Sequence, residues 1–179
     1  MRKKSVIALL SALLCLAAGC GKAPAPENSD GTVQPASDQS GFLWQITLLD
    51  AEASDNLANT QTFILYGGVT EDVQYAKTAR EGHIFLLLNL QIDKKGAGGQ
   101  RFSWADVWIE DAQGNQFRRM ENDVFLEDYD LTRLKSTDLT IGNNSGYICL
   151  EIPADTDLTG LRLIHEAAEG ENIIPIQVG

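Results

Sequence analysis

The strongest indication of the fold is the apolar stretch His83-Ile84-Phe85-Leu86-Leu87-Leu88-Asn89-Leu90-Gln91-Ile92. In an extended conformation its side chains alternate between two faces. One face is apolar throughout and carries Ile84, Leu86, Leu88, Leu90 and Ile92. The other face starts with Phe85 and Leu87 and turns polar at Asn89 and Gln91. Because no Pro or Gly interrupts it, we predict an interior strand of a sheet whose main face is fully covered.

Other short apolar runs, divided by turn signals, lie on both sides of this stretch. We expect strands at 42–49, 62–66, 102–110, 116–120, 138–141, 146–152, 161–165 and 173–178. Residues 50–59 read as polar and turn-like, 69–80 fit either a strand or a short helix, and 121–135 suggest an irregular crossover with one helical turn. Gly114 in Asp111-Ala112-Gln113-Gly114-Asn115 is placed for a hairpin. Seven to nine such strands predict an antiparallel β-sandwich.

The first residues are typical of an export signal. Met1-Arg2-Lys3-Lys4 is basic, and the run from Ser5 to Leu16 is uncharged and apolar. That run is short of the roughly 20 residues that a permanent membrane helix needs. Ala17-Ala18-Gly19-Cys20 resembles the bacterial lipobox, which implies diacylglyceryl transfer to Cys20 and cleavage before it. An ordinary secretory signal or an uncleaved anchor are the alternatives.

These features predict three segments: a lipoprotein signal peptide at 1–19, a lipidated Cys20 with a flexible linker at 20–41, and one folded domain at 42–179. The linker is rich in Pro and small polar residues, so we expect it to hold the domain on the order of 25 Å from the bilayer. Two or three acyl chains on Cys20 would anchor the protein stably. The expected location is the extracytoplasmic face of the cell membrane.

Charge and cysteine content narrow the function further. The signal removes three basic residues, so the formal net charge of −11 becomes −14. Such a surface disfavours nucleic acid and anionic lipid headgroups as partners. Cys15 leaves with the signal and Cys20 carries lipid, which leaves Cys149 as the only thiol and allows no internal disulfide. We expect Cys149 to be a buried structural thiol.

Three stretches together resemble a known group of domains. They are Glu81-Gly82-His83 to Ile92, the segment from Trp104 to Phe117 around its Asp-x-x-Gly-Asn hairpin, and the strand from Gly146 to Pro153. The pattern is similar to the immunoglobulin-like, telokin-like domains of unknown function that are found on bacterial lipoproteins, mostly Gram-positive. The resemblance covers roughly residues 42–178 and implies an immunoglobulin-like sandwich. It brings no catalytic residues and no cofactor.

Two groups of side chains are candidate sites. On an unbroken strand, Phe102, Trp104 and Trp108 would share one face and could bind a sugar ring or a partner peptide if they point outward. The alternative is that they pack in the core. The acidic residues of the crossover, Glu121, Asp123, Glu127, Asp128 and Asp130, are weak calcium candidates, because they lack the alternation of an EF-hand loop. A solvated charged face is the alternative reading.

Signals of catalysis are missing from the sequence. It has no Gly-x-Ser-x-Gly elbow and no pair of histidines at ligand spacing, since His83 and His165 are its only histidines. We therefore expect no metal, no cofactor and no enzymatic activity, and we predict a membrane-anchored binding or interaction module for an unknown protein or glycan. The alternatives are a surface hydrolase acting on cell-wall or glycan material through carboxylates that folding brings together, and an accessory subunit of a membrane transporter or sensor.

Overall fold

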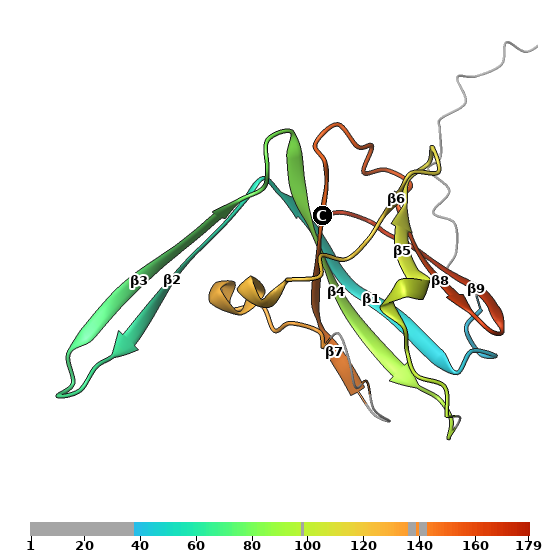
Figure 1. The fold of residues 1–179 in the computed structure, drawn as a ribbon, viewed down its shortest axis with the longest axis horizontal. Helices are drawn as coiled ribbons and strands as arrows, with labels where there is room; N and C mark the ends of the chain where they lie inside the picture. The colour runs from blue at the N-terminus through green and yellow to red at the C-terminus, as the bar shows by residue number, and fades with distance from the viewer. Residues whose placement is uncertain (1–37, 98, 136–138, 140–142) are drawn as a thin grey trace, which may run out of the picture. The chain divides into compact units, whose positions relative to one another are not determined.

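The computed structural model describes residues 38–97, 99–135, 139 and 143–179 (Figure 1). The predicted signal peptide, Cys20 and most of the predicted linker lie outside the described residues, as does the expected strand at 138–141 apart from Leu139. In the described part, nine strands form antiparallel sheets, and the only helices are two short 3-10 helices. The prediction of an all-β, antiparallel chain is confirmed.

The first sheet is built around the apolar stretch at 83–92. Strand β4 (His83–Lys94) lies between β1 (Trp44–Ser54) and β7 (Asn143–Pro153) and pairs antiparallel with both. Its residues from Phe85 to Leu88 are all buried. The interior strand is therefore confirmed, and it extends two residues beyond the predicted end.

The second sheet has four strands in the order β6 (Gln116–Phe117), β5 (Val107–Glu110), β8 (Arg162–Ala167) and β9 (Gly170–Pro175). A hairpin joins β5 to β6, with Gly114 at a φ of 84°. The Asp111 carboxylate accepts hydrogen bonds from the Asn115 backbone at 2.8 Å and from its amide side chain at 2.8 Å. The predicted hairpin is confirmed.

One apolar cluster joins the two sheets. Most of its buried members come from β1, β4 and β7 on one side and from β5, β8 and β9 on the other. Examples are Leu88, Ile148, Ile109, Leu163 and Ile174. Two sheets that enclose one core are the layers of a β-sandwich.

A second, smaller cluster covers the opposite face of the first sheet. Phe85 and Leu87 of β4 and Cys149 of β7 pack there against Leu126, which belongs to the 3-10 helix η2 (Val124–Tyr129) in the crossover. This contact explains why the first half of β4 is apolar on both faces. The crossover reaches β7 at Gly146, where an added Cβ would lie 2.6 Å from a backbone oxygen of the crossover.

The region from 50 to 80 differs from the prediction. Strand β1 continues to Ser54, and β2 (Asn56–Ile64) pairs with β3 (Thr70–Thr78) as a separate two-stranded sheet. The turn-like assignment of 50–59 was therefore wrong, and the ambiguity at 69–80 resolves to a strand. One face of these strands is buried or half-buried at 57, 59, 61, 73, 75 and 77. Because Asn59, Gln61 and Lys77 are among these positions, the strands lack the alternating apolar pattern that marks a strand with one buried face.

Smaller differences affect the strands of the second sheet. The segment 102–110 is a strand only from Val107, because Trp104–Asp106 form the 3-10 helix η1. The return strand stops at Phe117 instead of residue 120. The late strands, predicted at 161–165 and 173–178, are offset by one to three residues at their ends.

The buried position of β4 predicts a large effect of truncation. Leu88 has no exposed surface and contributes to the core between the sheets. Leu88→Ala should lower the free energy of unfolding by about 2 to 5 kcal/mol, through lost transfer energy and a residual cavity. Denaturant unfolding measures this. Leu49→Ala is the control, because the ladder shifts register between Leu48 and Asp50 and half of the Leu49 surface is exposed. Equal effects of the two changes would contradict an interior β4.

Candidate functional site

The β2–β3 hairpin contacts the crossover from its base to just beyond its middle, at Gln61. Asn59 donates hydrogen bonds to the Asp128 carbonyl at 3.0 Å and to the Asp130 carboxylate at 3.0 Å. Tyr75 makes an edge contact with Tyr129 at 6.5 Å between ring centroids. The Lys77 ammonium lies 4.6 Å from the centre of the Phe125 ring. Helix η2 and the residue after it therefore hold one face of the hairpin as far as Gln61, which donates to the Asp128 carbonyl at 3.1 Å.

The outer half of the hairpin is apolar and exposed. Strand β2 ends at Ile64 and the chain turns through two glycines, with a hydrogen bond of 2.7 Å from the Leu65 amide to the Val69 carbonyl. The exposed large apolar side chains there, which we call the apolar tip, are Phe63, Ile64, Leu65, Tyr66 and Val69. Ile64 is 80% exposed and Tyr66 is fully exposed. Figure 1 shows this end of β2 and β3 away from η2.

The apolar tip has water on both faces. Because side chains alternate along a strand, Phe63 and Ile64 at the end of β2 point to opposite faces, and Leu65, Tyr66 and Val69 follow in the connection to β3. No charged residue occurs from 62 to 70. A two-stranded hairpin is marginally stable by itself in water, and contiguous exposed apolar groups mark interaction sites more often than scattered ones do. The tip is therefore the strongest candidate binding surface in the described part of the chain.

The sequence predicts a strand at 62–66 that ends at two glycines, but β2 ends at Ile64. The exposure of these residues was not predicted. An apolar run normally indicates burial. The flanking sequence was the signal that could have indicated exposure. The neighbouring positions Thr60, Gln61, Glu71 and Asp72 are polar, so the apolar run does not continue into a buried face.

The aromatic site predicted on one strand face does not exist in that form. Helix η1 interrupts the strand between Phe102 and Trp108. Phe102 packs at the edge of the main core, 5.6 Å from the Trp44 ring and 5.1 Å from the Trp104 ring. Trp108 is only 9% exposed, and the Arg118 guanidinium lies 5.5 Å from its ring centre. These positions agree with the alternative that the rings are packed.

The acidic residues of the crossover have protein partners that the calcium hypothesis did not anticipate. Asp123 is 1% exposed and pairs with two guanidinium groups, Arg119 at 2.7 Å and Arg133 at 3.2 Å. Its carboxylate is therefore neutralised by protein groups, so it was wrongly included among the calcium candidates. Glu127 lies 3.8 Å from Arg133, and Asp130 accepts a hydrogen bond from the hairpin. Among the described residues no three His, Cys, Asp or Glu side chains are grouped to hold a metal.

This ion-pair network links the two ends of the crossover to each other. Burial lowers the pKa of Arg119, and the adjacent Asp123 carboxylate opposes that shift. Arg119 also donates to the Leu134 carbonyl and lies 4.5 Å from the centre of the Trp104 ring. Removing one partner of such a buried pair is strongly destabilising. The network therefore has a structural role in keeping η2 against β4 and β7.

Cys149 and the histidines show no arrangement for chemistry. Cys149 is buried, as predicted, and burial raises its thiol pKa to about 12. A thiol with such a pKa is a poor nucleophile at neutral pH. Burial also lowers the pKa of His165, whose ring lies 5.2 Å from the Phe102 ring. His83 contacts the Glu81 carbonyl through Nδ1 at 3.0 Å.

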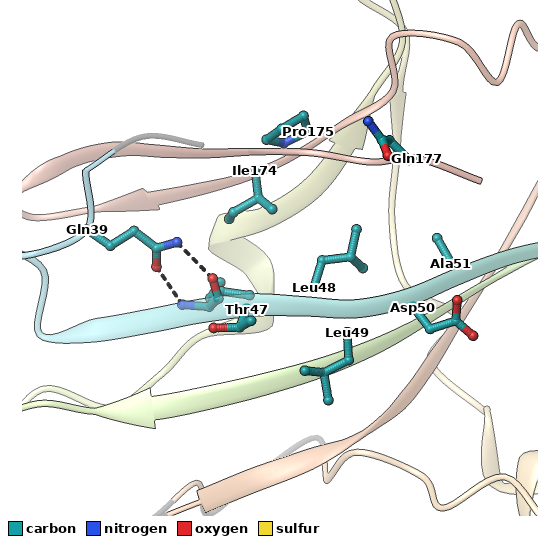
Figure 2. Close-up of a pocket in the computed structure, with 10 residues that line it drawn as sticks. Gln39, Thr47, Leu48, Leu49, Asp50, Ala51, Ile174, Pro175 and Gln177 are labelled. Carbon is teal, nitrogen blue, oxygen red and sulfur yellow. Dashed lines mark hydrogen bonds between the residues drawn. The ribbon is translucent and has the colours of Figure 1, made fainter. Parts of the chain in front are cut away.

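A cleft of about 500 Å³ lies between β1 and β9. Figure 2 shows Leu48 and Ala51 on β1 pointing toward Ile174 and Gln177 across this cleft. The Gln39 side chain closes one end by accepting a hydrogen bond from the Ile46 amide at 2.7 Å and donating one to its carbonyl at 2.8 Å. The amide group of Gln39 thus takes the place of a neighbouring strand at the edge of β1.

A second cleft of about 450 Å³ contains three carboxyl groups, Asp111, Asp155 and Asp157. The Asn115 side chain lowers the pKa of Asp111, and the Thr159 side chain lowers the pKa of Asp157, in each case by hydrogen bonding to the carboxylate. A general acid requires the opposite shift, because it must hold its proton near neutral pH. Neither of these two carboxyl groups has that property.

Comparisons with known proteins identify no family for this chain. No family model matches the chain, and no curated protein matches it. The crystal structure of an uncharacterized β-sandwich protein from Clostridium difficile 630 is similar with a TM-score of 0.42 and 9% identity, over 82% of this chain and 93% of that one. At that level nothing about function follows. Within the described residues, no helix is long and apolar enough to cross a membrane.

Proposed function

We propose that this protein is a lipid-anchored, extracytoplasmic lipoprotein whose immunoglobulin-like domain is a non-catalytic interaction module, with the apolar tip as its contact surface. The observation that carries the proposal is the exposure of Phe63, Ile64, Leu65, Tyr66 and Val69 at the end of a hairpin, beyond the contact of Gln61 with the crossover. Burial of apolar area on binding would stabilise a complex there, and aromatic residues such as Tyr66 are frequent in interface centres.

The membrane anchor rests on the sequence alone. A basic start, an uncharged apolar run and small residues before Cys20 support lipidation at that residue. The anchor would keep the apolar tip within reach of membrane and envelope proteins, which raises the effective concentration of the two partners. An accessory role beside a transporter or sensor is one form of this function.

The hydrolase alternative has less support. It requires two carboxylates facing one concave site with one of them held protonated. The second cleft brings three carboxylates together, but the pKa values of Asp111 and Asp157 are lowered. These shifts favour an interaction module over an acid-catalysed hydrolysis at that place.

Lipidation can be tested by changing one residue. Cys20→Ala removes the thiol that would receive the diacylglyceryl group, so we expect the protein to leave the membrane fraction and its processing to become insensitive to globomycin. Cell fractionation with immunoblotting measures both. Cys15→Ala is the matched control and should behave as the unchanged protein. Unchanged partitioning of the Cys20 variant would contradict the anchor.

Contact through the apolar tip can be tested by photo-crosslinking in intact cells. A photoreactive phenylalanine analogue at Tyr66 should give a discrete adduct with another envelope protein, because this side chain is fully exposed at the tip. The same analogue at Thr60, an exposed polar position nearer the hairpin base, is the control and should give none.

Ile64→Lys should abolish the Tyr66 adduct, because it places a charge within the contact surface. As an exposed substitution it should change the free energy of unfolding by no more than about 0.5 kcal/mol. An absent adduct at Tyr66, or an adduct that Ile64→Lys leaves unchanged, would contradict the apolar tip as the contact surface.

A further inference from the structure

The strands of this domain differ in how their edges are protected. Gln39 binds the edge of β1 at Ile46, and the Gly179 amide donates to the Ala51 carbonyl at 3.0 Å. The crossover covers the edge of β7, with a hydrogen bond of 2.8 Å from the Leu134 amide to the Tyr147 carbonyl. Among the residues that the structure describes, no strand pairs with the outer edge of β3. Unprotected strand edges are templates for pairing with another chain.

The hydrogen bonds at the two ends of the hairpin determine which groups of β3 face outward. The Leu65 amide donates to the Val69 carbonyl, and the Ala79 amide donates to the Asp55 carbonyl. Hydrogen-bonded pairs alternate along an antiparallel ladder, so residues 71, 73, 75 and 77 direct their backbone groups to β2. The even-numbered residues Thr70, Asp72, Gln74, Ala76 and Thr78 therefore direct theirs to the free edge.

We propose that this edge pairs with β3 of a second copy of the chain, antiparallel about a two-fold axis at Gln74, to form a continuous four-stranded sheet. In this register Thr70 lies opposite Thr78 of the second copy, Asp72 opposite Ala76, and Gln74 opposite Gln74. All of these residues have outward backbone groups, so each pair can exchange both of its main-chain hydrogen bonds. All nine residues of β3 take part.

Charge complementarity selects this register. The only charged residues of β3 are Glu71, Asp72 and Lys77. An axis at Gln74 places Glu71 of each copy directly opposite Lys77 of the other, which gives two cross-strand ion pairs. It also places the half-buried Val73 opposite the half-buried Tyr75. An axis moved by one residue, to Val73 or Tyr75, separates Glu71 from Lys77.

The self-complementarity of β3 is what favours a second copy over an unrelated strand. The formal net charge of −11 repels two copies at long range, but charges farther apart than about 8 Å are largely screened at physiological ionic strength. The pairing goes beyond the proposed function, because it uses the edge of β3 instead of the apolar tip. It would present two tips in one assembly.

Charge reversal tests the pairing in the full chain, purified in detergent. Glu71→Lys and Lys77→Glu each place like charges opposite one another twice per dimer, so each should weaken self-association by about tenfold. The double variant restores opposite charges and should recover the original dissociation constant to within about threefold. Sedimentation velocity measures the association. A monomeric unchanged chain, or a double variant no better than the single ones, would overturn the proposal.

Disulfide trapping gives a second measurement, because Lys77→Glu also removes the contact with Phe125 and could lower stability. Differently tagged chains with Val73→Cys and Tyr75→Cys, co-expressed and oxidised in membranes, should form a mixed disulfide dimer. Val73→Cys alone should give no more product than the unchanged chain. No mixed dimer, or equal trapping by Val73→Cys alone, would overturn the register. The crosslink at Tyr66 is independent of both results, so failure of the pairing and failure of the apolar tip as a contact surface are distinguishable.

Discussion

The fold depends on the complete enclosure of β4. This strand pairs with β1 along one edge and with β7 along the other, and apolar clusters cover both of its faces. The second sheet provides one cover and η2 provides the other. The second cover is held by the Asp123 carboxylate between Arg119 and Arg133, so a buried ion-pair network serves the burial of an apolar strand.

The same pair of strands leads to the proposed contact surface. Beyond the core, β1 and β4 lead directly into β2 and β3, and the hairpin continues past η2 until it ends in the apolar tip. Exposed apolar area lowers the solubility of a protein and contributes nothing to its fold. The absence of charge from 62 to 70, next to the acidic Glu71 and Asp72, confines the apolar contact surface to the end of the hairpin. This is the arrangement expected of a surface that binds.

The sequence predicted those parts of the structure that carry strong local signals. The strand at 83–92, the hairpin at 111–115 and the buried Cys149 follow from alternation, turn chemistry and apolar surroundings. The hairpin β2–β3 was predicted only in part, at 62–64, because polar residues such as Asn59, Gln61 and Lys77 occupy its half-buried face and leave no apolar period. The prediction that Phe102, Trp104 and Trp108 share one strand face was wrong, because a 3-10 turn at Trp104 breaks the alternation of side chains. The partners of Asp123 come from positions 4 and 10 residues away and meet only through the crossover.

Amide hydrogen exchange, measured in detergent and in native membranes, is the best test of whether a partner covers the apolar tip. In the full chain purified in detergent, the amides from 64 to 69 should exchange much faster than those of β4, because the few hydrogen bonds of this turn, such as that of the Leu65 amide, open readily at the end of a two-stranded hairpin. In native membranes, where a binding partner would be present, the same amides should exchange at least about tenfold more slowly, while those of β4 remain slow in both. Equally fast exchange of the tip in both environments would contradict its role as the contact surface.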